Sequence, residues 1–500
     1  MGSLLMSENI YDNENVLRKE KRRKLHEMRK NGINPYPYKY DRTCSLEEIR
    51  KKFENIEPGE KKEDQIFKLC GRLMAQRTMG KATFLNIMDQ YASIQVYIQN
   101  GELDELGQKS FDLIDIGDFV GISGFIFKTK KGELSLFAKS FEVLCKTLEP
   151  LPEKFHGISD PEIKYRYRHL DLIMDPQSRK VFETSSKIVR EIRSYLDEAG
   201  FLEVETPTLQ PIYGGAAAEP FQTHHRALDM TLYMKISPEL YLKRLIVGGY
   251  EKVYDLGKNF RNEGVDRTHN PEFTMLEWYE AWTDYNDQMI RFEQLVERLA
   301  IRITGSTKIS YQGKDIELKA PWKRLTVYDG LREYAQIDPE KISDDELFTI
   351  LKKYDEGMKE PLVRGKMLMN LFEFTVEPHL WQPTFVMDHP KEISPLTKVH
   401  RKNSNLVERF EPFCAGMEIG NAYSELNDPE DQLNRLLEQQ KQRSKDKEAH
   451  PMDDNFIHAI DVGMPPTGGV GLGVGRIVML LTDSTSIRDV ILFPTMKQKN

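Results

Sequence analysis

The chain has 500 residues, of which 39% are hydrophobic and 30% charged, and its formal net charge is −8. These values predict a soluble protein of about three domains, at ~150 residues each. They exclude a protein that is strongly basic overall, so any RNA-binding surface must be a local basic patch. The four cysteines are scattered, which argues against a disulfide framework and a zinc site. The sequence shows no apolar run near ~18 residues and no signal peptide, which argues against a membrane partner. Together these features predict a cytoplasmic protein.

Residues 1–64 are predicted to form an N-terminal extension. Its first residues are expected to be disordered, and a helix rich in Lys and Arg is expected over residues 15–31. Two roles stay open for this helix. It is either a solvated face on the protein surface or a basic arm that lies along RNA phosphates.

Residues 65–147 are predicted to form a small β-barrel. Five stretches between residues 66 and 145 alternate apolar and polar side chains, with turn signals at Gly80-Lys81 and Lys130-Lys131-Gly132. A helical piece, ELDELGQKSFDLI, lies between the third and fourth stretches. This order predicts an OB-fold, a barrel often used on single-stranded nucleic acid, although other five-stranded barrels share the pattern.

Residues 148–500 are predicted to form a larger domain, which begins with a proline-bearing linker. A helix is expected over residues 178–199, and a strand over residues 201–207 that ends at a proline. The helix either packs within its own subunit or forms a dimer interface. Residues 319 to about 390 are expected to be mostly helical and to form an insertion.

Residues 257–282 predict an antiparallel strand–loop–strand that gathers groups suited to a nucleotide. Arg261 and Glu263 are two apart and would share one face of the first strand, and His269, Asn270 and Phe273 would return along the second. An arginine fork matches phosphate or carboxylate oxygens, a glutamate accepts from an exocyclic amine such as that of adenine, and an aromatic ring can stack on a base. An ion-paired hairpin without a ligand is the alternative.

Two later segments carry further candidate groups. Glu411 and Glu418 suit Mg²⁺, which takes carboxylates together with substrate phosphates, although an acidic surface strand is the alternative. Glu425 shares a pocket with Glu418 only if the chain bulges or turns near Gly420. Residues 468–476 predict a glycine-rich strand that enters a helix at Arg476, with a spacing unlike that of dinucleotide or P-loop motifs.

The block FRNEGVDRTHNPEFTMLE resembles motif 2 of the class II aminoacyl-tRNA synthetases. From Cys70 to Pro494, the segments in order resemble a bacterial-type lysyl-tRNA synthetase. Residues 178–207 are similar to motif 1, which builds a dimer interface in that family, and residues 468–476 are similar to motif 3. The resemblance implies an α+β protein with an N-terminal five-stranded OB-fold barrel, followed by a catalytic domain on an antiparallel β-sheet flanked by helices.

The same resemblance implies ATP, L-lysine and tRNA(Lys) as partners, Mg²⁺ as cofactor, and a homodimer. The residues implied for lysine are Gly215, Glu239, Arg261, Glu277, Tyr279, Asn421, Tyr423 and Glu425. Those implied for ATP are Arg261, Glu263, His269, Asn270, Phe273 and Arg476, with Arg261 and Arg476 as catalytic residues. Glu411 and Glu418 would hold the metal, and the anticodon would be bound by Arg77, Phe84, Gln95 and Glu133.

Specific roles follow from the resemblance for the lysine site. Glu277, Tyr279 and Glu425 would hold the ε-ammonium of the substrate. Gly215 and Glu239 would hold its α-amine, while Arg261 would bridge its carboxylate and the ATP α-phosphate. A neutral amino acid would leave buried glutamates unpaired, so we expect strong rejection of such competitors without an editing domain.

The chain departs from the family pattern at four positions. Gly475 stands where Asp is usual, Thr268 where some bacterial relatives have Arg, Tyr423 where Phe is common, and Glu219 where Arg is more common. Arg267 lies next to Thr268 and could replace the missing arginine. Two other functions remain as alternatives. A paralogue that modifies a protein would lack the barrel, and a non-catalytic RNA-binding protein would lack Arg261, Glu263 or Arg476.

Overall fold

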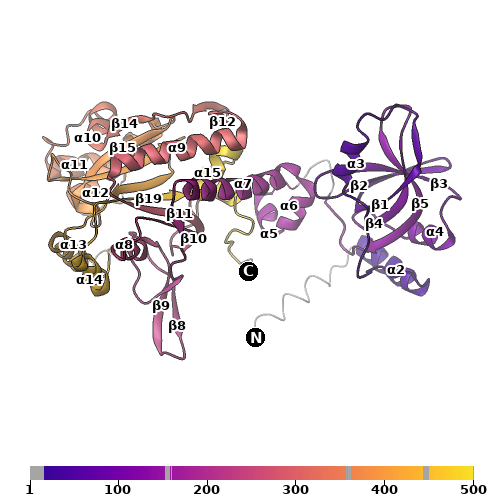
Figure 1. Cartoon of the computed structure of the whole chain (residues 1–500), viewed down its shortest axis with the longest axis horizontal. Helices are drawn as coiled ribbons and strands as arrows, with labels where there is room; N and C mark the ends of the chain where they lie inside the picture. Colours follow the sequence, from indigo (N-terminus) through magenta and orange to yellow (C-terminus); the bar gives the residue numbers. More distant parts are fainter. Residues whose placement is uncertain are drawn as a thin grey trace. The chain divides into compact units, whose positions relative to one another are not determined.

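The computed structural model describes residues 16–152, 158, 160–355, 357, 362–442 and 450–498. The chain divides into two compact units, Met1–Gly157 and Ile158–Asn500 (Figure 1), and each is described by itself. The expected disorder of the first residues lies outside the described residues. Within the described residues, no helix is both long and apolar enough to cross a membrane. All four cysteines are free thiols.

The first unit is built on a closed five-stranded barrel with the strand order β1-β2-β3-β5-β4. Its strands are β1 (Lys61–Met79), β2 (Ala82–Met88), β3 (Ser93–Gln99), β4 (Phe119–Lys128) and β5 (Leu134–Cys145). Side chains along β2 and β3 alternate between buried and partly exposed, because one face fills the barrel. The helix α4 (Glu105–Asp112) lies between β3 and β4. The predicted OB-fold is therefore confirmed.

Two short helices precede the barrel, α2 (Val16–Lys30) and α3 (Leu46–Lys52). The basic helix α2 buries Met28 in the apolar core of the barrel. Its Lys24 ion-pairs with Asp115 at 2.6 Å, and the buried Lys21 donates to Thr147 Oγ1 at 3.1 Å. Part of the positive charge of α2 is thus used within the protein, so neither of the two roles left open for this helix describes it fully.

The second unit is built on a nine-stranded sheet with the order β14-β15-β16-β18-β19-β11-β10-β6, and β17 pairs with β16. Its pairings are antiparallel except β14–β15 and β10–β6. The strands are β6 (Leu202–Glu203), β10 (Lys252–Phe260), β11 (Glu272–Ala281), β14 (Lys323–Thr326), β15 (Thr384–Pro390), β16 (Leu406–Cys414), β17 (Met417–Glu418), β18 (Gly420–Ser424) and β19 (Thr467–Gly473).

Helices cover both faces of this sheet, and β11 shows how the faces divide. Leu276 and Trp278 are buried in the core formed with α7 (Pro176–Glu198), α9 (Tyr285–Thr304) and α15 (Val474–Thr482). Tyr279 belongs to a different apolar cluster, formed with α8 (Glu239–Val247) and α14 (Asp454–Val462). Successive side chains of a strand point to opposite faces, so one strand serves both layers.

Smaller elements complete the second unit. Two short sheets join β7 (Leu209–Gln210), β8 (Gln222–His225) and β9 (Met230–Met234), and β12 (Lys308–Tyr311) with β13 (Lys314–Glu317). The remaining helices are α5 (Pro161–Arg166), α6 (Arg168–Met174), α10 (Val327–Gly330), η1 (Leu331–Ala335), α11 (Asp344–Leu351), α12 (Arg364–Thr375), η2 (Glu377–His379), η3 (Lys391–Ile393), α13 (Pro429–Gln442) and η4 (Ile487–Asp489).

Two expectations about this unit were wrong in detail. The strand predicted over residues 201–207 is only two residues long, Leu202–Glu203, because it lies at the edge of the sheet and pairs with β10 alone. The segment 319–390 is not helical at its ends. Its first and last parts are β14 and β15, which pair with each other in the main sheet, and the helices lie between them.

Candidate active site

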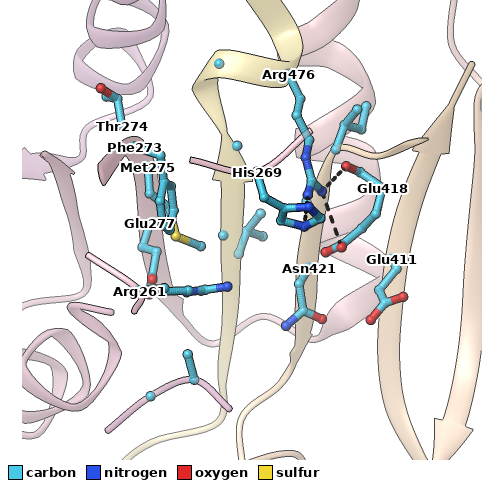
Figure 2. Close-up of a pocket in the computed structure, with 18 of the residues that line it drawn as sticks. Arg261, His269, Phe273, Thr274, Met275, Glu277, Glu411, Glu418, Asn421 and Arg476 are labelled. Atoms are coloured by element: carbon cyan, nitrogen blue, oxygen red, sulfur yellow. Dashed lines mark hydrogen bonds and ion pairs between the residues drawn. The ribbon is translucent and has the colours of Figure 1, made fainter. Parts of the chain in front are cut away.

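A cavity of about 340 Å³ opens over the centre of the nine-stranded sheet. Its walls come from β11, from β16, β17, β18 and β19, and from the loop 261–271. Figure 2 shows Arg261 and Glu277 on one side, with His269, Arg476 and Glu418 grouped opposite them. Every residue that the sequence predicted for ATP, lysine or metal lines this cavity, except Glu425.

The floor of the cavity is the glycine-rich strand β19, which lies between β11 and β18 as a continuous part of the sheet. A Cβ atom at Gly469 would lie 2.0 Å from Glu425 Oε1 and 2.5 Å from the ring of Tyr279. A Cβ atom at Gly471 would lie 2.6 Å from the Met275 side chain. These glycines therefore leave room for the side chains of neighbouring strands beside the cavity.

Arg261 lies in a loop, not on a strand as predicted, because β10 ends at Phe260 and β11 begins at Glu272. Glu263, His269 and Asn270 lie in the same loop, and only Phe273 is on a strand. The Arg261 guanidinium lies over the Phe273 ring, 5.2 Å from its centroid. Its buried Nε has no hydrogen-bond partner among the described residues, so this donor is available to a ligand.

His269 and Arg476 meet at the outer side of the cavity. Arg476 Nη2 lies 3.1 Å from His269 Nε2, and His269 Nδ1 lies 2.8 Å from Asp266 Oδ2. A guanidinium can only donate, so Nε2 accepts and the ring proton sits on Nδ1, where it is donated to Asp266. Arg476 also donates to the backbone carbonyl of Glu418 and lies 3.4 Å from its carboxylate. The side chains of Arg476 and His269 stay partly exposed to solvent.

Glu411 and Glu418 have oppositely shifted pKa values. Burial would raise the pKa of Glu411, but Arg409 at 2.6 Å and His389 at 3.4 Å hold it at about 2. Burial and the charge of Glu411 raise the pKa of Glu418. A cation between them would relieve this repulsion. Among the described residues, no group of three or more His, Cys, Asp or Glu could hold a metal by itself, and a two-carboxylate site suits Mg²⁺ that arrives with phosphates.

Carboxylates and tyrosines line the inner end of the cavity. Ser237 Oγ donates to Glu277 Oε1 at 2.8 Å, Tyr279 OH lies 3.3 Å from Glu277 Oε2, and Tyr423 OH donates to Glu239 Oε2 at 2.5 Å. Burial, followed by the charge of Glu239, raises the pKa of Glu277 to about 8. Buried carboxylates that repel one another form a site for a positively charged ligand.

Gly215 and Asn421 line the same inner end. Gly215 has a φ of +85°, and a Cβ atom there would lie 2.7 Å from Ser237 Oγ and 2.8 Å from the Glu239 Cβ atom. Only glycine fits this position without displacing the two neighbours. Asn421 Oδ1 accepts a hydrogen bond from Arg409 Nε at 2.9 Å, which leaves its amide nitrogen as a donor.

Glu425 lies beneath the cavity and does not line it. It is 1% exposed, and its Oε2 atom is 2.5 Å from the Nζ atom of Lys243. The predicted break near Gly420 is present, because β17 ends at Glu418 and β18 begins at Gly420. Burial raises the pKa of Glu425 well above its ordinary value, with further contributions from Glu239 and Glu277, although Lys243 opposes the shift.

Sequence reasoning missed three residues of this site. Arg409 holds both Glu411 and Asn421, Ser237 holds Glu277, and Lys243 holds Glu425. The spacing of residues in the sequence could have identified two of them. Arg409 precedes Glu411 by two residues on one strand, and Lys243 follows Glu239 by four residues on one helix, so each pair shares a face. Ser237 lies in a loop, where no periodicity points to it.

The departures from the family pattern have local partners. A Cβ atom at Gly475 would lie 2.7 Å from Ile487 Cδ1, so a larger residue here requires Ile487 to move. Thr268 donates to Asp266 Oδ1 at 3.0 Å. Arg267 donates to the carbonyl of Thr485 at 3.1 Å and is not among the residues that line the cavity. The backbone carbonyl of Glu219 accepts from the amide of Asn262.

The residues predicted for an anticodon lie on neighbouring barrel strands. Arg77 on β1 is opposite Phe84 on β2, whose ring lies 5.3 Å from that of Tyr97 on β3. Phe84 alternates with the buried Thr83 and Leu85, so it faces outward and is not part of the barrel core. Gln95 donates to Ser135 Oγ at 2.9 Å, and Ser135 donates to the carbonyl of Glu133.

Comparison with known protein families matches two regions. Residues 160–497 match the family described as tRNA synthetases class II (D, K and N), and residues 67–144 match an OB-fold nucleic acid binding domain. A lysine–tRNA ligase from Thermoanaerobacter pseudethanolicus is 49% identical over 99% of each chain. One from Clostridium novyi is 50% identical over 97% of this chain and 95% of its own. This chain therefore belongs to the class II tRNA synthetases of the D, K and N group.

Proposed function

We propose that the protein is a lysine–tRNA ligase, which activates L-lysine with ATP and transfers the lysyl group to the 3′-terminal ribose of tRNA(Lys). The observation that carries the amino-acid assignment is the pair Glu239 and Glu277 at the buried inner end of the cavity, with Glu425 buried beneath it. A strongly hydrated ammonium group leaves water only for closely placed carboxylates, so this end suits a cationic side chain. The lysine–tRNA ligases that match the full chain support the same substrate.

The first step joins the lysine carboxylate to the ATP α-phosphate and releases pyrophosphate. Arg261 lines the same cavity, and its free donor would bridge the two reacting anions. Arg476 and His269 would bind the distal phosphates, and Phe273 and Glu263 the adenine. The residues contribute by orientation and by charge, and no general base is assigned.

Glu411 and Glu418 would hold Mg²⁺, which supplies charge neutralisation to the phosphates of ATP when it is bound. The two carboxylates line the cavity on the side of Arg476, and Arg409 keeps Glu411 ionised. The contact between Arg476 and Glu418 would be exchanged for contacts to metal and phosphate.

Selection of lysine over neutral amino acids would rest on Glu277, Tyr279 and Glu425 at the ε-ammonium and on Gly215 and Glu239 at the α-amine. Asn421 and Tyr423 would complete the wall. A neutral side chain would leave buried carboxylates without a cation, which carries a penalty of several kcal/mol. A difference in binding free energy of this size between lysine and neutral amino acids makes an editing domain unnecessary.

The barrel would read the anticodon through its outward face. Phe84 would stack on an unpaired base, Gln95 and Glu133 would contact base edges, and Arg77 would contact a phosphate or base. The exposed basic residues of α2, including Lys19 and Arg29, could add phosphate contacts near this unit.

Two further proposals concern assembly and compartment. The strand β6 lies at the edge of the sheet and exposes Leu202 (45%), and Leu209 nearby in sequence is 48% exposed, so a second copy of the chain would cover apolar surface there and form a homodimer. The free thiols fit the reducing cytoplasm.

The structure gives less support to the two alternative functions. A paralogue acting on proteins is disfavoured by the complete barrel, and a non-catalytic protein by the presence of Arg261, Glu263 and Arg476 around one cavity. The test is ATP–pyrophosphate exchange with Mg²⁺, without tRNA, for each of the twenty amino acids. Exchange with lysine alone is expected. Exchange with a neutral amino acid, or with none, would contradict the proposal.

A further inference from the structure

A lysine of the protein itself lies beneath the inner end of the cavity. Lys243 lies on α8, one turn after Glu239, and its side chain is 0% exposed. Its Nζ atom is 2.5 Å from Glu239 Oε1 and 2.5 Å from Glu425 Oε2. The rings of Tyr423 and Phe456 lie 5.5 Å and 5.8 Å from the ammonium group. The proposed function assigns the ammonium groups of the substrate to these same two carboxylates. One side of each carboxylate is thus already occupied by an ammonium group of the protein.

Lys243 uses only one oxygen of each carboxylate. The second oxygen of Glu239 accepts from Tyr423 OH, a residue that lines the cavity. The second oxygen of Glu425 has no hydrogen-bond partner among the described residues and lies beneath Gly469, which has no side chain to cover it. Lys243 therefore fixes the orientation of both carboxylates while leaving a buried acceptor at the cavity floor.

The charges at this end balance only when Lys243 is counted. Glu239, Glu277 and Glu425 supply three negative charges when ionised, and Arg261 and Lys243 supply two positive charges. L-lysine carries one net positive charge near neutral pH and would bring the site to neutrality. Without Lys243, the buried site would remain negative after lysine had bound, and its carboxylates would retain protons instead.

We propose that Lys243 is a positioning residue for amino-acid recognition, which orients Glu239 and Glu425 and sets the charge of the site to match that of lysine. This proposal rests on the lysine–tRNA ligase function. Lys243 would not contact ATP, because it lies beneath the inner end of the cavity and is not among its lining residues.

The barrel offers a matched control. Lys146 is also 0% exposed in its side chain and lies 2.5 Å from Asp115 Oδ2 and 2.7 Å from Asp118 Oδ2. Here the other carboxylate oxygens are used within the protein: Asp118 Oδ1 accepts from Thr147, and Asp115 Oδ1 accepts from Lys24. Removal of Lys146 breaks the same type of buried cluster at a position in the other compact unit.

The experiment compares Lys243→Met with Lys146→Met in ATP–pyrophosphate exchange without tRNA, with KM determined separately for lysine and ATP between pH 6 and pH 9. For Lys243→Met we expect the KM for lysine to rise at least roughly 30-fold at pH 7 and to recover partly toward pH 9, with the KM for ATP changed less than about threefold. Lys146→Met should leave both constants within about threefold of the parent protein.

Lys243→Gln provides a second variant in case Lys243→Met does not fold, because its amide can donate to both carboxylates without a charge. It should show the same selective rise in the KM for lysine. Equal rises for lysine and ATP, or a KM for lysine within about threefold of the parent in either folded variant, would overturn the proposal. Absence of lysine-dependent exchange in the parent protein would instead overturn the proposed function.

Discussion

The two ends of the cavity recognise charge in different ways. At the inner end, Glu277 is 3% exposed and Glu425 1% exposed, and their partners are a few fixed hydroxyl groups and one lysine. At the outer end, His269 and Arg476 are partly exposed and already bonded to each other. Buried charges interact strongly but must be matched one to one, whereas solvated charges tolerate imperfect matches. The inner end therefore suits selection among amino acids, and the outer end suits the binding of phosphates that every substrate set shares.

The largest effect is expected from Glu277→Gln, which removes the buried negative charge that Glu277 would carry with lysine bound and keeps the size of the side chain. We expect kcat/KM for lysine to fall roughly 300-fold or more, because the ammonium group loses a desolvated partner, while the KM for ATP stays within about threefold. Exchange kinetics with each substrate varied separately measure this. An equal loss for lysine and ATP would remove the distinction between the two ends.

The pH dependence of lysine binding is expected to be nearly as large. The pKa of Glu277 in the empty protein is about 8, raised by burial and by Glu239, and lysine binding favours the ionised form. Binding should therefore release a proton, and lysine affinity should rise about tenfold per pH unit from pH 6 to pH 8 and level off above it. Calorimetric titration in buffers of different ionisation enthalpy counts the protons released. ATP binding should lack this proton release.

The raised pKa of Glu277 makes the free energy of unfolding depend on pH in the opposite direction to lysine affinity. The folded protein holds a proton on Glu277 that the unfolded chain, with an ordinary value of 4.5, has released. The free energy of unfolding should therefore fall as the pH rises from about 4.5 through about 8. Glu277→Gln removes this loss, so the inactive variant should melt at a higher temperature than the parent protein at pH 8 without lysine.

Arg476→Ala tests the outer end. We expect a loss of roughly 30-fold in kcat/KM for ATP, since the arginine is one of several solvated groups near the phosphates, and a salt dependence weaker than in the parent protein. The KM for lysine should change little. A loss for lysine as large as that for Glu277→Gln would show that the two ends act as one site.

The smallest effect is expected from Glu263→Gln, which makes the same chemical change as Glu277→Gln at an exposed position. The KM for ATP should rise only about threefold to tenfold, because water replaces the lost contact to the adenine amine. The pair Glu263→Gln and Glu277→Gln thus compares one substitution in two solvent environments. Equal effects from both would mean that burial does not govern recognition in this cavity.

The sequence predicted elements with strong periodicity well and loop geometry less well. The barrel strands and the helix near residues 178–199 follow from alternation and helical spacing, because each has one face buried. The placement of Arg261 and Glu263 on a strand was wrong, because pairing with β11 ends at Phe260 and no sequence pattern marks that end. The ends of the segment 319–390 were also misassigned, since β14 has only four residues and one strand partner.

For the site, it was easier to predict from the sequence which residues belong to it than which side chains contact one another. The fourteen residues of the second unit named for ATP, lysine or metal that line the cavity were found through the family resemblance. The buried position of Glu425 was not predicted, because it depends on Lys243, which lies on a helix far away in the sequence. The support that Arg409 gives to Glu411 is visible as spacing on one strand, but only the structure shows that it also holds Asn421.

From Leu276 to Tyr279, the strand β11 alternates core residues and site residues, with Leu276 and Trp278 on one face and Glu277 and Tyr279 on the other. A register error of one residue during folding would place a tryptophan at the lysine site and a glutamate in the apolar core. A sheet with this register error would lose the lysine site and would also bury a carboxylate in the apolar core. A molecule that binds lysine must therefore have the correct strand register. Lysine-dependent protection of β11 amides in hydrogen exchange would consequently serve as an assay of correct folding for the whole sheet.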